Sequence, residues 1–184
     1  HSRALYLFPT KALAHDQLRR LRAMAQVLGV EGVFPYDGDT PSATRRQARE
    51  RGLVLLSNPD MLHYGLLPRH PDWAPFLARL RYVVLDELHA YRGVFGTHVA
   101  LILRRLLRLA RHYGASPQVL AASATIANAR EHAEALTGLP FEELKAQVAR
   151  TERELLVLLP KPLDRRGERR RSPLLEAAYL ARRL

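Results

Sequence analysis

The fold is decided by residues 81–89, which read Arg-Tyr-Val-Val-Leu-Asp-Glu-Leu-His. A short apolar run, Tyr82–Leu85, is followed at once by two carboxylates, Asp86 and Glu87, and then by His89. Such a run is typical of a strand buried in a parallel sheet, where ligands bind at the carboxyl ends of the strands. Two desolvated carboxylates need a cationic partner, and a magnesium ion that carries nucleotide phosphates would satisfy both. The same residues also fit a strand that enters a solvated helix, with Asp86 or Glu87 as its N-cap.

The rest of the chain shows an alternation of strand-like and helix-like segments. Runs of strand length occupy residues 4–8, 33–34, 53–56 and 118–122, and helical patterns occupy residues 11–28, 41–51, 97–113 and 128–137. This alternation predicts an α/β fold, a parallel sheet with helices on both faces. We expect the strands that end at Phe8, Leu56, Leu85 and Ala122 to be neighbours or one apart. Asp86 and Ser123 would then lie at one edge. Residues 65–75 contain three prolines and predict an irregular surface loop.

Composition limits the class of protein. The 184 residues are 47% hydrophobic, which is enough for one domain with a core. No apolar run is as long as a membrane span, so we expect no membrane partner. The absence of cysteine excludes disulfides and thiolate zinc sites and favours the cytoplasm. The chain begins with His1 rather than Met and shows no signal peptide, so we expect a fragment.

The charge points to a polyanionic partner. A net charge of +11 and a pI near 10.8 are typical of proteins that bind nucleic acid. Nearly all the cations are arginine, which is also what a GC-rich genome would produce, so charge alone leaves both explanations open. The arginines of the helix over residues 97–113 lie opposite its apolar stripe, and we interpret them as a solvated face.

Four loops follow strand candidates, in the order Pro9-Thr10-Lys11-Ala12-Leu13, Ser57-Asn58-Pro59-Asp60, Asp86-Glu87-Leu88-His89 and Ser123-Ala124-Thr125. Together they resemble motifs Ia, Ic, II and III of a superfamily 2 helicase of the DExH type. The turn at residues 36–40, Tyr-Asp-Gly-Asp-Thr, resembles the glycine-containing loop between the first two motifs. Residues 85–96 narrow the likeness to the Lhr-like and mitomycin repair factor A-like DNA helicases. The resemblance covers roughly residues 5–139.

The resemblance implies a RecA-like sheet of the P-loop NTPase class, truncated at both ends. Residues 1–150 would be a partial first RecA-like domain that carries motifs Ia to III. Residues 151–184 would be a linker and the start of the second RecA-like domain. The sequence contains no Gly-x-x-x-x-Gly-Lys-Ser/Thr, so the phosphate-binding Walker A loop would precede His1. The arginine finger of the second domain would follow Leu184.

The resemblance also implies roles for the acidic loop. Asp86 would hold Mg²⁺ through water, and Glu87 would orient or deprotonate the attacking water. His89 would join this site to motif III, where Ser123, Ala124 and Thr125 would couple the nucleotide state to strand separation. The hydroxyls of Ser123 and Thr125 could equally serve as helix N-caps.

A second set of residues would face the nucleic-acid backbone: Thr10, Lys11, Gly38, Asn58 and Asp60. Hydroxyl, ammonium and amide groups suit phosphates without reading sequence. A carboxylate at such a surface can only repel or position, so we expect Asp60 to cap its own helix.

The implied function is that of an ATP-dependent DNA helicase in DNA repair, which uses ATP and Mg²⁺ to translocate 3′ to 5′ and unwind DNA. Its substrate would be single-stranded DNA or a duplex with a 3′ tail, and the fragment alone would be inactive. Two alternatives stay open. One is a non-enzymatic module that binds single-stranded nucleic acid. The other is a metal-dependent hydrolase with ligands among Asp86, His89, His98 and His63.

Overall fold

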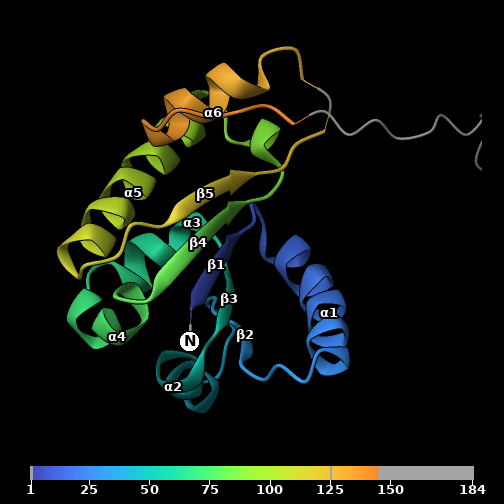
Figure 1. The fold of residues 1–184 in the computed structure, drawn as a ribbon, viewed down its shortest axis with the longest axis vertical. Coiled ribbons are helices and arrows are strands. Elements are labelled where there is room, and N and C mark those ends of the chain that lie inside the picture. The colour runs from blue at the N-terminus through green and yellow to red at the C-terminus, as the bar shows by residue number, and fades with distance from the viewer. Residues whose placement is uncertain (1, 125, 145–184) are drawn as a thin grey trace, which may run out of the picture. The chain divides into compact units, whose positions relative to one another are not determined.

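The computed structural model describes residues 2–124 and 126–144, which belong to one compact unit. Five strands form a single sheet in the order β2-β3-β1-β4-β5, and every pair of neighbours is parallel (Figure 1). They are β1 Arg3–Leu7, β2 Val33–Pro35, β3 Val54–Ser57, β4 Leu80–Leu85 and β5 Gln118–Ala121. The parallel α/β fold predicted from the alternation of elements is therefore confirmed, and so is the adjacency of the four strands that end in candidate motifs.

The described residues contain six α-helices, five that lie between strands and a last one that follows β5: α1 Lys11–Val27, α2 Ser42–Arg51, α3 Pro59–Met61, α4 Ala74–Leu77, α5 Gly93–His112 and α6 Ala129–Thr137. A π-helical turn, Leu62–Leu66, continues α3, and short 3₁₀ turns occupy His70–Trp73 and Leu88–Ala90. Figure 1 shows α1 on one side of the sheet and α4, α5 and α6 on the other. Helices thus cover both faces, as expected for parallel strands that are apolar on both sides.

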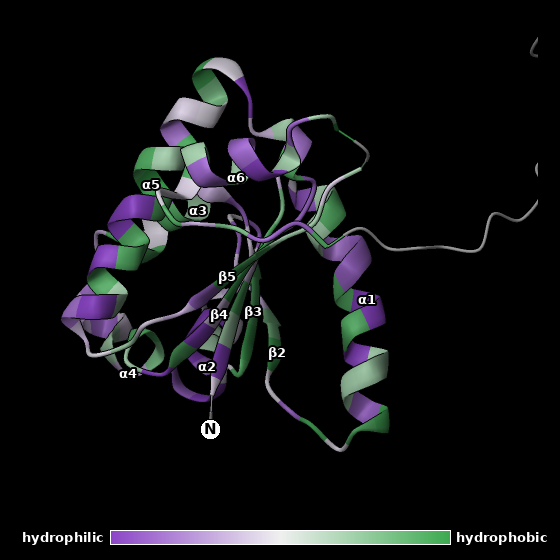
Figure 2. Ribbon diagram, turned by 45° about the horizontal axis from the view of Figure 1, so that its top comes forward, coloured by the Kyte–Doolittle hydropathy of each residue, from purple (hydrophilic) through white to green (hydrophobic). Residues whose placement is uncertain are grey.

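Two apolar cores follow from the alternation of side chains along the strands. On β1, Leu5 and Leu7 point into the larger core, which contains the buried stripe of α5. Phe8 and Leu56 point into the smaller core under α1. Figure 2 shows the apolar residues concentrated in the central strands, while α1 and α5 carry both hydrophilic and hydrophobic residues. The α1 side is covered only in part, because Tyr82 and Leu120 on β4 and β5 remain 38% and 44% exposed.

The prediction of an irregular surface loop at residues 65–75 is wrong. This segment forms the end of the π-helical turn, a 3₁₀ turn and the start of α4, and it buries Leu66, Leu67 and Trp73 completely or almost so. Pro71 and Pro75 occupy first-turn positions of the short helices, where a missing N–H costs nothing, and Pro68 lies in the turn before them. Proline therefore begins helices here.

The carboxyl ends of the strands bring the candidate motifs to one edge. The Asp86 amide donates to the Leu7 carbonyl at 3.0 Å, and the Leu88 amide donates to the Ala122 carbonyl at 2.9 Å. Asp86 and Ser123 therefore lie on the same edge, as predicted. Among the described residues, no helix is both long enough and apolar enough to cross a membrane. Residues 151–184, expected to be a linker and the start of a second RecA-like domain, lie outside the described residues.

Candidate nucleotide and nucleic-acid site

The acidic loop after β4 has an unusual backbone. Glu87 has φ 52° and ψ 47°, and it is the one non-glycine residue with positive φ in the described part of the chain. A left-handed conformation costs a side-chain-bearing residue about 1–2 kcal/mol, and such strain gathers at functional sites. The Asp86 carboxylate accepts the Glu87 amide through Oδ1 at 3.0 Å. Oδ2 has no hydrogen-bond partner among the described residues, so it is free for a ligand.

The predicted catalytic residues are brought together. His89 lies in the 3₁₀ turn after Glu87, and its Nδ1 is 3.2 Å from Glu87 Oε2. The same nitrogen is 3.5 Å from the hydroxyl of Ser123, which follows β5. The acidic loop and the end of β5 are thus connected through one imidazole. Ala124 is exposed beside Ser123, and Thr125 lies outside the described residues.

The capping alternatives for these residues have no support. Glu87 precedes the 3₁₀ turn but makes no capping hydrogen bond with its side chain. The helix after Ser123 begins at Ala129, and Asn128 occupies its N-cap position. The motif residues are therefore left available for other contacts.

The metal-hydrolase alternative also finds no support in residues 2–124 and 126–144, which hold no cluster of three or more His, Asp or Glu side chains able to bind a metal. His63 and His98 line a hollow of about 450 Å³ between α3 and α5 together with Asp60. Asp86 and His89 do not line it. The four proposed ligands do not converge.

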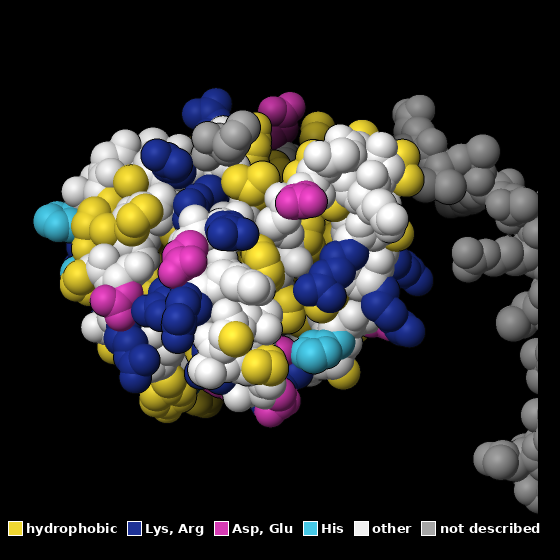
Figure 3. Space-filling view, turned by 90° about the horizontal axis from the view of Figure 1, so that it is seen from below, with side chains coloured by type: hydrophobic (Ala, Val, Ile, Leu, Met, Phe, Trp, Pro, Cys, Tyr) yellow, Lys and Arg dark blue, Asp and Glu magenta, His cyan; other side chains and the backbone are white. Residues whose placement is uncertain are grey.

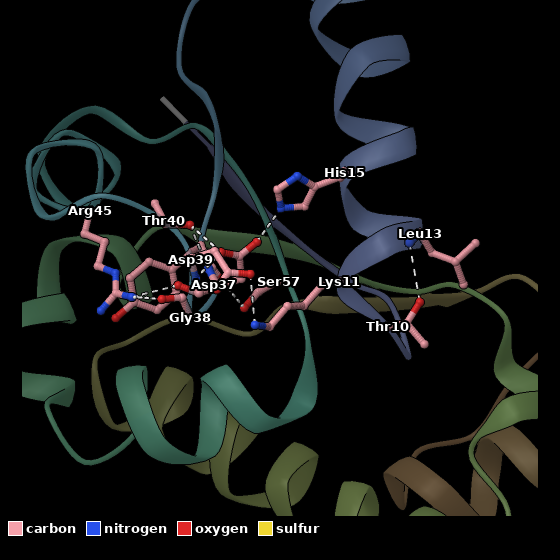
Figure 4. Close-up of polar contacts among 11 residues, drawn as sticks. Thr10, Lys11, Leu13, His15, Asp37, Gly38, Asp39, Thr40, Arg45 and Ser57 are labelled. Atoms are coloured by element: carbon pink, nitrogen blue, oxygen red, sulfur yellow. Dashed lines mark hydrogen bonds and ion pairs between the residues drawn. The ribbon is translucent and has the colours of Figure 1, made fainter.

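The turn at residues 36–40 is held against α1 by a hydrogen bond and an ion pair (Figure 4). His15 Nε2 is 2.7 Å from Asp37 Oδ2, and Lys11 Nζ is 3.0 Å from Asp39 Oδ2. Asp37 also accepts hydrogen bonds from the Thr40 hydroxyl and the Asp39 amide. Burial alone would raise the pKa of Asp37, but the hydrogen bonds from His15, Thr40 and Asp39 outweigh it and keep the pKa below its ordinary value. These contacts hold the turn beside α1 as a platform.

This platform places Gly38 against Lys11. A Cβ at Gly38 would come within 3.3 Å of Lys11 Nζ, so glycine allows the ammonium to approach the turn. Arg45 supports the other side of the turn by donating to the carbonyls of Asp37 and Gly38 at 2.9 Å each. Lys11 and Gly38, which the sequence predicts as nucleic-acid contacts, therefore lie side by side.

Thr10 and Asn58 act as helix caps. The Thr10 hydroxyl accepts the Leu13 amide at 3.4 Å, and the Asn58 amide oxygen accepts the Met61 amide at 2.8 Å. The expectation that Asp60 caps its own helix is wrong, because Asn58 fills that position and Asp60 lies exposed in the first turn. Asn58 is 7% exposed, so its side chain supports the loop.

The positive charge is not confined to these loops. Residues 1–144 contain 18 Lys and Arg against 13 Asp and Glu, a net +5 of the +11 for the chain. Figure 3 shows Lys and Arg side chains spread over the face seen from below, where the strands begin. The motif loops and the turn at residues 36–40, at the opposite, carboxyl edge, contain Lys11 and no arginine, so a phosphate contact there would depend on a few placed groups.

The sequence did not reveal three residues that organise this edge: His15, Ser57 and Tyr91. The Ser57 hydroxyl donates to the Tyr36 carbonyl at 2.6 Å, and the Tyr91 hydroxyl donates to the Leu7 carbonyl at 3.3 Å. Each contact joins residues far apart in sequence, which no local pattern reports. The available signals were the position of His15 one turn after Lys11 on the same helix, and the positions of Ser57 and Tyr91 within the segments that carry the resemblance.

Comparison with known proteins agrees with this geometry. The model of the DEAD/DEAH box helicase family matches residues 1–134. The chain is 47% identical over 163 residues to the uncharacterized ATP-dependent helicase YprA of Bacillus subtilis, covering 88% of this chain and 22% of that protein. It is 41% identical over 140 residues to the ATP-dependent helicase HRQ1 of Saccharomyces cerevisiae, covering 73% of this chain and 13% of that protein.

A solved structure extends the match. The crystal structure of the DUF1998 helicase MrfA bound to DNA and AMPPNP superposes with a TM-score of 0.84 and 45% identity, covering 99% of this chain and 26% of that chain. The chain thus spans about a quarter or less of the length of these relatives. Because the family model covers most of the sequence and the RecA-like fold agrees, this chain belongs to the DEAD/DEAH box helicase family.

Proposed function

We propose that the chain forms the motif II half of an ATP site, and one side of a nucleic-acid path, in an ATP-dependent DNA helicase. The observation that carries this proposal is the strained Glu87 beside Asp86 at the carboxyl edge of a parallel sheet, linked by His89 to Ser123. The relatives named as ATP-dependent helicases support the use of ATP. The MrfA structure with DNA and AMPPNP supports DNA as the polymer.

The acidic loop can perform the hydrolytic chemistry of such an enzyme. Asp86 offers an unpaired carboxylate oxygen, which fits a water-coordinated Mg²⁺ that would neutralise phosphate charge. Glu87 projects from a backbone held in one conformation and would orient the attacking water or accept its proton. His89 contacts both Glu87 and Ser123, so it can carry a change at the acids to the end of β5.

The nucleic-acid side would use Lys11, Gly38 and the Thr10 hydroxyl, with Asn58 and Asp60 shaping the neighbouring loop. These groups would contact the backbone of single-stranded DNA or of a 3′ tail, so binding would not depend on sequence. Translocation 3′ to 5′, a role in repair, a cytoplasmic location and a second RecA-like domain that begins near residue 151 belong to the same proposal. The non-enzymatic nucleic-acid-binding module is the alternative, since the 184 residues contain no Walker A motif.

The test is Glu87→Gln in the full-length protein. This change keeps the shape but removes the charge that handles water, so ATP hydrolysis should fall about 10²–10⁴-fold while nucleotide binding persists. Glu131→Gln on α6 removes an equivalent exposed carboxylate and should leave turnover intact. Wild-type turnover by Glu87→Gln would remove Glu87 from the mechanism. A wild-type protein without nucleic-acid-stimulated ATPase activity would favour the binding module.

A further inference from the structure

One peptide group lies at the centre of the sheet edge that carries both proposed sites. The carbonyl of Leu7 accepts the Asp86 amide at 3.0 Å and the Tyr91 hydroxyl at 3.3 Å. The amide of Phe8, in the same peptide group, donates to the Ser57 carbonyl at 3.0 Å. This single group therefore connects the acidic loop with the residue that precedes Asn58. It is also two residues before Thr10.

Tyr91 is held rigidly at this point. Its side chain is 0% exposed, and its ring packs 5.8 Å from that of Phe95. Its backbone is pressed against α5, where a Cβ at Gly96 would come within 2.4 Å of the Tyr91 carbonyl oxygen. The Tyr91 ring is therefore enclosed, and its backbone lies in close contact with the start of α5. Its hydroxyl is the one side-chain donor that the described residues direct at the Leu7 carbonyl.

The Tyr91 phenol also lies in the electric field of the acidic loop. Burial, and then the negative charges of Asp86 and Glu87, raise the pKa of Tyr91. The hydroxyl therefore stays protonated and remains a donor at all working pH values. A cation that neutralises the carboxylates would change the electric field at this hydroxyl. A shift of Asp86 would move the other donor to the Leu7 carbonyl, which is the Asp86 amide.

We propose that Tyr91 is a positioning residue that couples the nucleotide site to the nucleic-acid loops through the Leu7–Phe8 peptide group. This inference rests on the proposed function and deepens it by naming the connection between its two sites. The backbone bonds of the sheet edge are fixed by the fold. The Tyr91 hydroxyl can be removed alone, which makes the coupling testable.

The experiment is Tyr91→Phe in the full-length protein, with ATP hydrolysis measured without and with single-stranded DNA. Loss of the hydrogen bond should lower the ratio of stimulated to unstimulated rate by about 2–10-fold. Tyr113→Phe is the matched control, because it removes a phenol hydroxyl that contacts His70 at 2.7 Å, far along the chain from the acidic loop. Its ratio should equal that of the wild type.

A binding measurement guards against a loss of activity that is merely structural. The ratio of DNA affinities with and without a non-hydrolysable ATP analogue reports the same coupling without turnover, because coupling between two sites is reciprocal. Tyr91→Phe should move this ratio toward one, at a temperature below its melting point. An unchanged ratio, or equal losses of stimulated and unstimulated rate, would overturn the role of Tyr91. If the wild type shows no stimulation at all, the proposed function fails instead.

Discussion

At the scale of single residues, the site is marked by strain at Glu87. Glu87 stands two residues after Leu85, the last residue of β4, and its backbone is left-handed. The chain therefore turns sharply at the point where it presents two consecutive acids. If stability alone determined the residue at this position, glycine would be favoured, because glycine adopts positive φ without a steric cost. The presence of glutamate indicates that its carboxylate, rather than the turn, is what the position requires.

This strain predicts a difference between two substitutions. Glu87→Ala removes the carboxylate but keeps a Cβ in the left-handed region, whereas Glu87→Gly removes both. We expect the glycine variant to be the more stable of the two by about 1 kcal/mol, measured by urea denaturation of the 184-residue chain. Both variants lack the carboxylate, so both should be inactive in the full-length protein. Equal stabilities would mean that the turn is not strained.

At the scale of elements, the segment from Leu62 to Leu77 contains three prolines and nevertheless buries a tryptophan. Its short helical turns bury Trp73 and Phe76 in the larger core, where the two rings meet edge to face at 5.7 Å. Arg3 lies over the Phe76 ring at 5.4 Å, which joins the segment to the first strand. The segment belongs to the core although its composition is that of a loop.

Two substitutions in this segment should have different effects on stability, because one position is buried and the other is exposed. Trp73→Ala should destabilise the chain by about 3–5 kcal/mol, because it removes a large buried side chain and leaves a cavity. Tyr64→Ala, in the same segment but 76% exposed, should change stability by less than about 0.5 kcal/mol. Thermal and denaturant unfolding of both variants would test this. Similar small effects for both would restore the loop interpretation.

At the scale of the whole molecule, charge and site are separate properties. Of the net charge of +11, more than half falls beyond residue 144, and the motif loops with the turn at residues 36–40 carry one lysine, Lys11, against five carboxylates, Asp37, Asp39, Asp60, Asp86 and Glu87. Lys11 is paired with Asp39, so a phosphate must compete with a carboxylate for it. Binding of nucleic acid by the chain alone should consequently be weak.

We expect the 184-residue chain to bind single-stranded DNA weakly, without sequence preference and without measurable ATPase activity. For roughly four phosphate contacts, the slope of log affinity against log salt should be about −3. Lys11→Ala should remove one phosphate contact and make that slope shallower by about 0.7 for every sequence tested. Arg20→Ala removes a charge from the exposed side of the same helix and should leave the slope almost unchanged. Salt-independent binding, or ATP turnover by this chain, would contradict the prediction.

The sequence by itself determined the sheet and the motifs at its edge. The strands are short apolar runs and α5 has a clear amphipathic stripe, so local periodicity was enough to predict them. Parallel strands present their carboxyl ends at one edge, so the meeting of Asp86 and Ser123 also followed. Local chemistry assigned the helix cap after β3 to Asp60, whereas Asn58 fills that position.

Only the tertiary structure decided which side chains connect the loops. His15 and Asp37 are 22 residues apart, and Tyr91 and Leu7 are 84 apart, so neither pair leaves a periodic signal in the sequence. The burial of the apolar side chains in residues 66–77 was decided in the same way, since proline-rich turns bury them only where a sheet and α5 enclose them: Leu66, Leu67, Trp73, Phe76 and Leu77. Periodicity records which face of an element is apolar, whereas the partner that covers that face depends on the packing of the whole chain.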